Sequence, residues 1–218
     1  MEAKRTEDPS YESQRLTMPV GEAMFTQRAI RRMKPDPIPV KDLKLILDAA
    51  SKAPNGGNRQ LGRFLLITDR AVIQDFGKLY REAWWAKRAD EKQPWTRRED
   101  IPEHEKNHRS AARLADELKD APCLVLACAP SMALAHSILP GCQNLMLAAR
   151  TLGIGSVLTT LHPKVMDRVH ALLKIPKEVA ILHVIPLGYP QGHFGPNSRL
   201  PTSQTTFFNT WGSPVPWK

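Results

Sequence analysis

The segment that most restricts the fold of this chain is Ala53-Pro54-Asn55-Gly56-Gly57-Asn58-Arg59-Gln60. The apolar residues before it recur at the spacing of one helix face: Leu43, Ile46, Leu47 and Ala50. After it, the apolar run 64–68 predicts a buried strand. This helix–loop–strand order is the reverse of a dinucleotide-binding glycine loop, and a Walker-type lysine is missing, so neither nucleotide motif applies. A helix stop with a turn is one interpretation, and a glycine loop whose amides bind a polar heterocycle is the other.

A second informative segment precedes that helix and reads Gln27-Arg28-Ala29-Ile30-Arg31. We expect a helix from about Val20 to Thr26 or Arg32, because the prolines at 35, 37 and 39 end it. Arg28 and Arg31 would then share one helix face and grip a phosphate from two sides. A basic, solvent-exposed turn is the alternative. Together with the amide-rich loop, the arginines favour a cofactor that has an anionic tail and a hydrogen-bonding ring, and flavin mononucleotide (FMN) fits that description.

The rest of the chain alternates apolar runs with helical periodicity. Strands are predicted at 123–128, 157–161 and 180–187, and helices around 72–80 and 145–152. Uniformly apolar strands separated by helices predict an α/β or α+β sheet that is covered on both faces. We expect a flexible N-terminal arm over residues 1–19 and a single domain over 20–218.

Two parts of that domain lack clear periodicity. The insertion at about 84–108 carries Trp84, Trp85 and Trp95 among many charges, and it is predicted to be a mobile lid over a pocket or a neighbouring subunit. Tryptophans that face the core from a helix are the alternative. The C-terminal extension at about 200–218 contains several aromatic residues, which are expected to pack on a partner subunit, and a disordered end is the alternative.

Composition excludes several classes of protein. The 218 residues are 42% hydrophobic and 24% charged, as in ordinary globular proteins, and apolar runs of the ~20 residues that span a bilayer are missing. The charged N-terminus does not resemble a secretory signal, so a cytoplasmic location without membrane contact is expected. The three cysteines and seven histidines lack the paired spacing of a metal site, so neither metal nor disulfide is expected. The net charge of +9 indicates a basic surface or an affinity for anionic ligands, and nucleic acid is ranked low because recognisable binding motifs are missing.

Several segments resemble the nitroreductase family of FMN flavoproteins. Residues 26–32 are similar to its Arg-Arg-Ser-x-Arg opening, and residues 49–60 to its Ala-Pro-Ser-x-x-Asn-x-Gln loop. Residues 152–160 resemble its Leu-Gly-Leu-Gly turn and the following strand, and their Thr159-Thr160 pair resembles the flavin-facing threonines of iodotyrosine deiodinases in the same superfamily. The late segments 186–190 and 197–201 also match. The order of these motifs makes the resemblance specific to the superfamily.

The resemblance implies an α+β fold with a central mixed sheet flanked by helices, in a domain-swapped type of homodimer with FMN at the interface. The residues implied for the FMN phosphate and ribityl chain are Gln27, Arg28, Ala29, Ile30, Arg31 and Arg199. Those implied to approach the ring from the partner are Pro54, Asn55 and Gly56, with Asn58 and Gln60 contacting the ring or bracing the loop. Those implied to lie along the flavin are Leu158, Thr159 and Thr160. Gln27, Ala29 and Asn55 depart from the arginine, serine and serine of the family pattern.

The implied activity is an FMN-dependent oxidoreductase. It would take hydride from NAD(P)H and then reduce a nitroaromatic, quinone or related electron-poor small molecule on the same flavin face, in a ping-pong sequence. Because the cofactor carries this chemistry, we assign no acid–base catalytic residue. The alternatives are a flavin-binding protein without turnover and a reductive dehalogenase-like flavoprotein.

Overall fold

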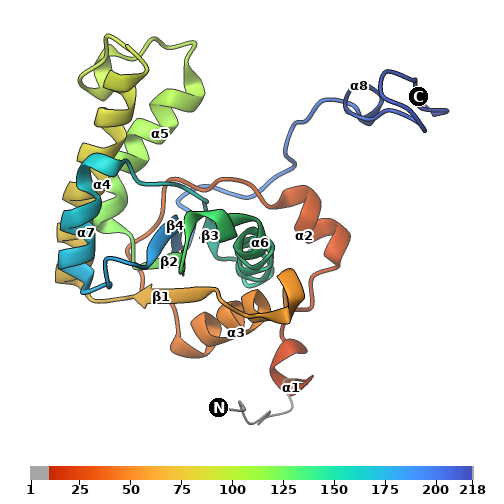
Figure 1. Ribbon diagram of the computed structural model, residues 1–218, viewed down its shortest axis with the longest axis horizontal. Coiled ribbons are helices and arrows are strands. Elements are labelled where there is room, and N and C mark those ends of the chain that lie inside the picture. The colour runs from red at the N-terminus through yellow and green to blue at the C-terminus, as the bar shows by residue number, and fades with distance from the viewer. Residues whose placement is uncertain (1–9, 218) are drawn as a thin grey trace.

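The computed structural model describes residues 10–217 and places a small sheet between two groups of helices (Figure 1). The strands are β1 (Arg63–Ile67), β2 (Cys123–Ala129), β3 (Gly155–Ser156) and β4 (Ala180–Gly188), in the order β1-β2-β4-β3. All three strand pairs are antiparallel. Among the described residues, parallel pairing is limited to a bridge between Ala29 and Ser156, so the mixed character of the sheet is slight. The predicted α+β class is confirmed.

The central strand β2 is buried along its whole length. Its side chains alternate between two cores, with Val125 in one and Leu124 and Leu126 in the other. A strand that is covered on both faces has no solvent side, which explains its uninterrupted apolar run.

One face of the sheet is covered by α3 (Val40–Ser51) and α6 (Ala135–Thr151). Leu43, Ile46 and Ala50 form the buried stripe of α3, as their spacing predicts. α6 is followed by Gly153, which has φ +72°, a conformation that favours glycine and turns the chain towards β3.

The other face is covered by α4 (Arg70–Asp90), α5 (Lys106–Glu117) and α7 (Met166–Leu173). Asp69 caps α4 by accepting hydrogen bonds from the backbone N–H groups of Ala71 and Val72 at 2.9 and 3.2 Å. α4 continues ten residues beyond the predicted 72–80 range, so Trp84 and Trp85 lie on this helix, half-buried. The first part of the expected lid is therefore helical.

Both ends of the described chain lie outside this sandwich. α1 (Ser10–Ser13) and α2 (Val20–Thr26) precede α3, and an ion pair between Arg15, which follows α1, and Asp42 of α3 joins this part of the chain to the body. The remainder of the expected arm, residues 1–9, lies outside the described residues. After β4 the chain runs away from the body and includes α8 (Thr202–Thr205), as Figure 1 shows. Between residues 10 and 217, the model contains no helix that is long and apolar enough to cross a bilayer.

The strand predicted at 157–161 is wrong in its bounds, because regular pairing stops at Ser156. Beyond it, backbone pairing with β4 within residues 10–217 is limited to a bridge between Thr159 and Val184. The apolar character of Val157 and Leu158 reflects packing against the two cores rather than continuous strand pairing.

All three cysteines of the chain are buried and unpaired. Burial raises the pKa of the Cys123 thiol to about 12 and those of Cys128 and Cys142 to about 11. Since the thiolate is the reactive form, we expect the folded protein at pH 8 to resist iodoacetamide and the denatured protein to take up three labels. Mass spectrometry after timed labelling measures this, and rapid labelling of the native protein would contradict the burial.

Candidate functional site

The arginine segment after α2 is extended. Gln27, at φ −67° and ψ 123°, already leaves the helix. The backbone N–H of Ile30 donates to the carbonyl of Ser156 at 2.9 Å, and this pairing holds the segment along β3. The prediction that Arg28 and Arg31 share a helix face is therefore wrong, since tertiary pairing with β3 overrides the local helical pattern.

The two arginines nevertheless act on one another electrostatically. Burial lowers the pKa of Arg31, and the positive charge of Arg28 lowers it further, whereas nearby Tyr80 acts in the opposite direction. Among the described residues, neither guanidinium has a carboxylate within 4.0 Å. A half-buried cation next to a second cation, without a neutralising acid, favours an anionic ligand.

Tyr80 connects this arginine to the segment that follows β3. Burial raises the pKa of the Tyr80 phenol, and both a hydrogen bond with Thr159 and the charge of Arg31 oppose that shift. The Thr159 hydroxyl also donates to the Val184 carbonyl at 2.9 Å. Leu158 packs against the first core, while Thr160 is exposed. The structure thus brings Arg31 and Thr159, two of the predicted site residues, to the same part of the molecule.

The C-terminal segment around Asn197 lies against the end of α2 and the arginine segment that follows it. The backbone N–H of Asn197 donates to the Phe25 carbonyl at 3.3 Å, and its side-chain amide donates to the Gln27 carbonyl at 2.9 Å. Arg199 follows two residues later and is exposed, and among the described residues its side chain donates only to the carbonyl of its neighbour Ser198, at 2.7 Å. Arg199 is therefore attached, through Asn197, to the segment that carries Arg28.

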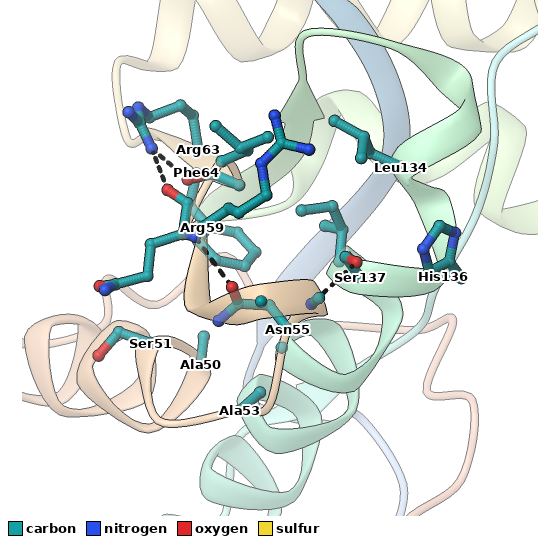
Figure 2. A pocket seen from close by; sticks show the side chains of 17 residues that line it. Ala50, Ser51, Ala53, Asn55, Arg59, Arg63, Phe64, Leu134, His136 and Ser137 are labelled. Atoms are coloured by element: carbon teal, nitrogen blue, oxygen red, sulfur yellow. Dashed lines mark hydrogen bonds between the residues drawn. The ribbon is translucent and has the colours of Figure 1, made fainter.

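The loop between α3 and β1 forms one wall of a separate cavity of about 410 Å³ (Figure 2). The Asn55 side chain accepts from the Gln60 backbone N–H at 2.9 Å, and the Gly56 N–H donates to the Ser137 hydroxyl at 3.3 Å. Asn58 and Gln60 both have φ +52°, a strained conformation for residues other than glycine. The Gln60 amide donates to the Asn58 carbonyl at 3.4 Å, so these two residues brace the loop.

Residues from both ends of the chain segment 50–141 line this cavity. Its walls are partly apolar, through Phe64, Leu134 and Ile138, and partly polar, through Arg59 and His136. Ser137 and His136 lie at the start of α6. They were not identified from the sequence as site residues, because no local sequence pattern connects them with a loop eighty residues earlier. Tyr80 was missed because its spacing marks it only as a core residue.

The predicted site residues therefore fall into two sets within one chain. One set, Gln27–Arg31 with residues 158–160 and Arg199, lies along β3 and its neighbours. The other set, Asn55, Gly56 and Gln60, lines the 410 Å³ cavity. None of the residues of the first set is among the described residues that line it.

A close backbone approach fixes the first set. A Cβ atom added to Gly155 would lie 2.6 Å from Cγ2 and 2.7 Å from Cβ of Ile30. We expect Gly155→Ala to displace the arginine segment and to lower the free energy of unfolding by about 1–3 kcal/mol. Urea unfolding measures this. The control is Gly21→Ala, which meets nothing within 4 Å and should leave stability unchanged or slightly higher. Equal stability of both variants would contradict the close packing.

Comparison with known proteins decides the family. A family model described as "Nitroreductase family" matches residues 25–189, well over half of the chain. The chain belongs to the nitroreductase family. This match spans the arginine segment, the loop and the sheet described above.

Relatives of this nitroreductase-family chain extend over most of its length. A Thermus thermophilus protein named NADH dehydrogenase is 30% identical over 88% of this chain and 98% of the relative. A Thermotoga neapolitana protein named iodotyrosine deiodinase is 28% identical over 85% of this chain and 95% of the relative. The crystal structure of a nitroreductase with bound FMN from Bacteroides fragilis has a TM-score of 0.66 at 20% identity, and the match covers 88% of this chain and all of that chain (100%). At that identity, the structural likeness establishes the fold.

Proposed function

We propose that this protein is an FMN-dependent oxidoreductase that takes hydride from NAD(P)H and reduces an electron-poor small molecule. The observation that carries the proposal is the pair of guanidinium groups, Arg28 and half-buried Arg31, without a carboxylate partner in the described part of the chain. Membership of the nitroreductase family supports the reaction class, and the relative named NADH dehydrogenase supports a nicotinamide reductant.

The residues present fit FMN at its phosphate end. Arg28, Arg31 and Arg199 would hold the phosphate, because planar guanidinium groups suit its oxygens. Gln27, Ala29 and Ile30 would run along the ribityl chain, although Gln27 and Ala29 supply fewer polar contacts than the family pattern does. The FMN-bound structure from Bacteroides fragilis supports this assignment through its shared fold.

We further propose that the complete site needs two copies of the chain. Pro54, Asn55 and Gly56 would approach the ring of a flavin held by the partner, since the cavity that Asn55 and Gly56 line includes neither Arg28 nor Arg31 among its described lining residues. The C-terminal extension supports a homodimer, because its aromatic side chains are exposed. Trp211 is 91% exposed, and Phe207, Phe208 and Trp217 are each 42–48% exposed. Monomers seldom expose apolar side chains in such groups unless a partner covers them.

The flavin, when bound, supplies the hydride and electron transfer, and the protein positions the reactants. Thr159 is tied to Val184 through its backbone and its hydroxyl, so it would hold the chain in a fixed place beside the ring. Thr160 is exposed, and its hydroxyl would be available to that ring. The apolar wall of Phe64, Leu134 and Ile138 would exclude water and receive the acceptor in the partner's site. NAD(P)H and the electron acceptor would bind the same face of the flavin, one after the other.

The absorbance spectrum of the purified protein, followed by anaerobic titration with NADH and NADPH, tests the proposal. We expect flavin bands that bleach with either reductant and return when a quinone or nitroaromatic is added. Parallel lines in double-reciprocal plots would support the ping-pong sequence. A colourless protein that does not bind added FMN would overturn the proposal. A yellow protein whose flavin is bleached by neither NADH nor NADPH would favour flavin binding without turnover.

Reductive dehalogenation is a second candidate, favoured by the relative named iodotyrosine deiodinase and by the Thr159-Thr160 pair. It predicts that halogenated tyrosines oxidise the reduced protein and release halide. Reoxidation by quinones but not by halotyrosines would exclude it.

A further inference from the structure

A second cavity, with a volume of about 460 Å³, lies between Arg32 and the start of α5 and is strongly basic. Its charged lining residues are Arg32, Arg98, Glu103, Lys106, Arg109 and Arg113. Five cations therefore face a single carboxylate. Arg32 directly follows Arg31, so the cavity adjoins the segment that is proposed to hold the flavin phosphate.

Most of these cations are not neutralised. Arg98 lies within 3.8 Å of Glu99 and 4.0 Å of Glu117, so it is partly compensated. Arg109 donates to the Ile101 carbonyl at 2.8 Å, an interaction that positions the guanidinium without cancelling its charge. Within residues 10–217, Arg32, Lys106, Arg109 and Arg113 form no ion pair. Glu103 can balance one of these four charges.

The helix adds to the positive potential. α5 carries Lys106, Arg109 and Arg113 in its first eight residues, and its N-cap residue, Glu105, makes no capping hydrogen bond to the helix and lies 2.8 Å from His108 instead. Free N–H groups make the beginning of a helix positive, so cations there are unfavourable unless an anion is present. An anion bound in the cavity would therefore be stabilised both by these side chains and by the start of the helix.

We propose that this basic cavity binds the phosphate groups of NADPH, an assignment that rests on the proposed oxidoreductase function. A pyrophosphate carries about two negative charges, and the 2′-phosphate that distinguishes NADPH from NADH adds about −1.5 to −2. The surplus of at least three positive charges exceeds what a pyrophosphate alone requires. The cavity therefore binds NADPH more tightly than NADH, and Arg31-Arg32 links the reductant's phosphates to the flavin side of the molecule.

The test uses the flavin-loaded protein and a Lys106→Gln/Arg113→Gln variant. The matched control is Lys41→Gln/Lys44→Gln, which also removes two exposed cations, but from α3, on the opposite face of the sheet from α5. With a quinone acceptor, we expect the KM for NADPH to rise about tenfold or more in the cavity variant, because charge-assisted contacts to phosphate are lost. The KM for NADH should rise much less, and kcat should stay near its original value. An unchanged KM for NADPH, or equal rises for both nucleotides, would overturn the proposal.

A binding experiment separates this inference from the proposed function. We expect 2′,5′-ADP to bind the wild-type protein more tightly than 5′-AMP, as measured by calorimetry, and to bind the cavity variant weakly. If neither reductant bleaches the flavin but 2′,5′-ADP still binds in this way, the proposed reaction fails and the phosphate site stands. If inorganic tripolyphosphate binds as well as 2′,5′-ADP and both variants bind alike, the cavity is not a nucleotide site.

Discussion

An Arg28→Ala/Arg199→Ala protein should purify without flavin colour. The two side chains come from segments that the Asn197–Gln27 hydrogen bond holds together, so they can grip one phosphate from two directions. A hydrogen bond between charged groups contributes about 1.5–3 kcal/mol, so losing both should weaken FMN binding by about 3–6 kcal/mol, or roughly 10² to 10⁴-fold. Flavin content per chain after purification and the Kd of added FMN, from flavin fluorescence, measure the loss.

The control for this variant removes two cations elsewhere. Lys78→Ala/Arg81→Ala acts on surface ion pairs with Asp75 and Asp116 and should retain full flavin. Circular dichroism of both variants shows whether they fold alike. A folded Arg28→Ala/Arg199→Ala protein that keeps its full flavin content would contradict the proposal that Arg28 and Arg199 hold the FMN phosphate.

Mixing two inactive variants should restore activity if each flavin site is shared between chains. The first is Arg28→Ala/Arg199→Ala, which loses the phosphate side. The second is Gly56→Leu, which places a bulky side chain on the loop that is proposed to face the partner's flavin. In a heterodimer formed from both, one site carries both changes and the other carries neither, because a twofold axis exchanges the contributions. Random association should therefore restore about a quarter of the wild-type sites.

Mixing under denaturation and refolding, with flavin added, measures the recovery. Each variant refolded alone gives the baseline, and wild type refolded in the same way gives the full value. A mixture that stays at the baseline, while size measurements show dimers, would mean that each chain builds its site alone.

Much of the fold could be predicted because the signals are local. The stripe of α3 and the apolar run of β2 appear at almost their predicted bounds, since burial on one face or on both leaves a direct pattern in the sequence. The glycine loop before β1 was also placed correctly between its helix and its strand.

The arginine segment could not be predicted in this way. Its local pattern suits a helix, but Ile30 pairs with Ser156, which lies more than a hundred residues later. The roles of Tyr80 and Ser137 depend in the same way on distant partners, Thr159 and Gly56. Their types are compatible with many environments, and only the tertiary structure selects one.

The basic cavity was hidden for a related reason. The segment 84–108 lacks a sustained period, so the sequence predicted a mobile lid over a pocket or a neighbouring subunit. In the structure, helix α5 gathers Lys106, Arg109 and Arg113 on one side, and the extended segment after α2 brings Arg32 to the same cavity. A charge cluster built from two remote segments leaves no spacing that a sequence pattern can detect.

The burial of all three cysteines bears on the compounds that the protein is proposed to handle. Quinones and the partly reduced products of nitroaromatics are electrophiles to which thiolates add. With thiol pKa values of about 11 to 12, Cys123, Cys128 and Cys142 stay protonated and shielded at neutral pH. The chain therefore offers such compounds no reactive sulfur, and repeated turnover should leave it unalkylated.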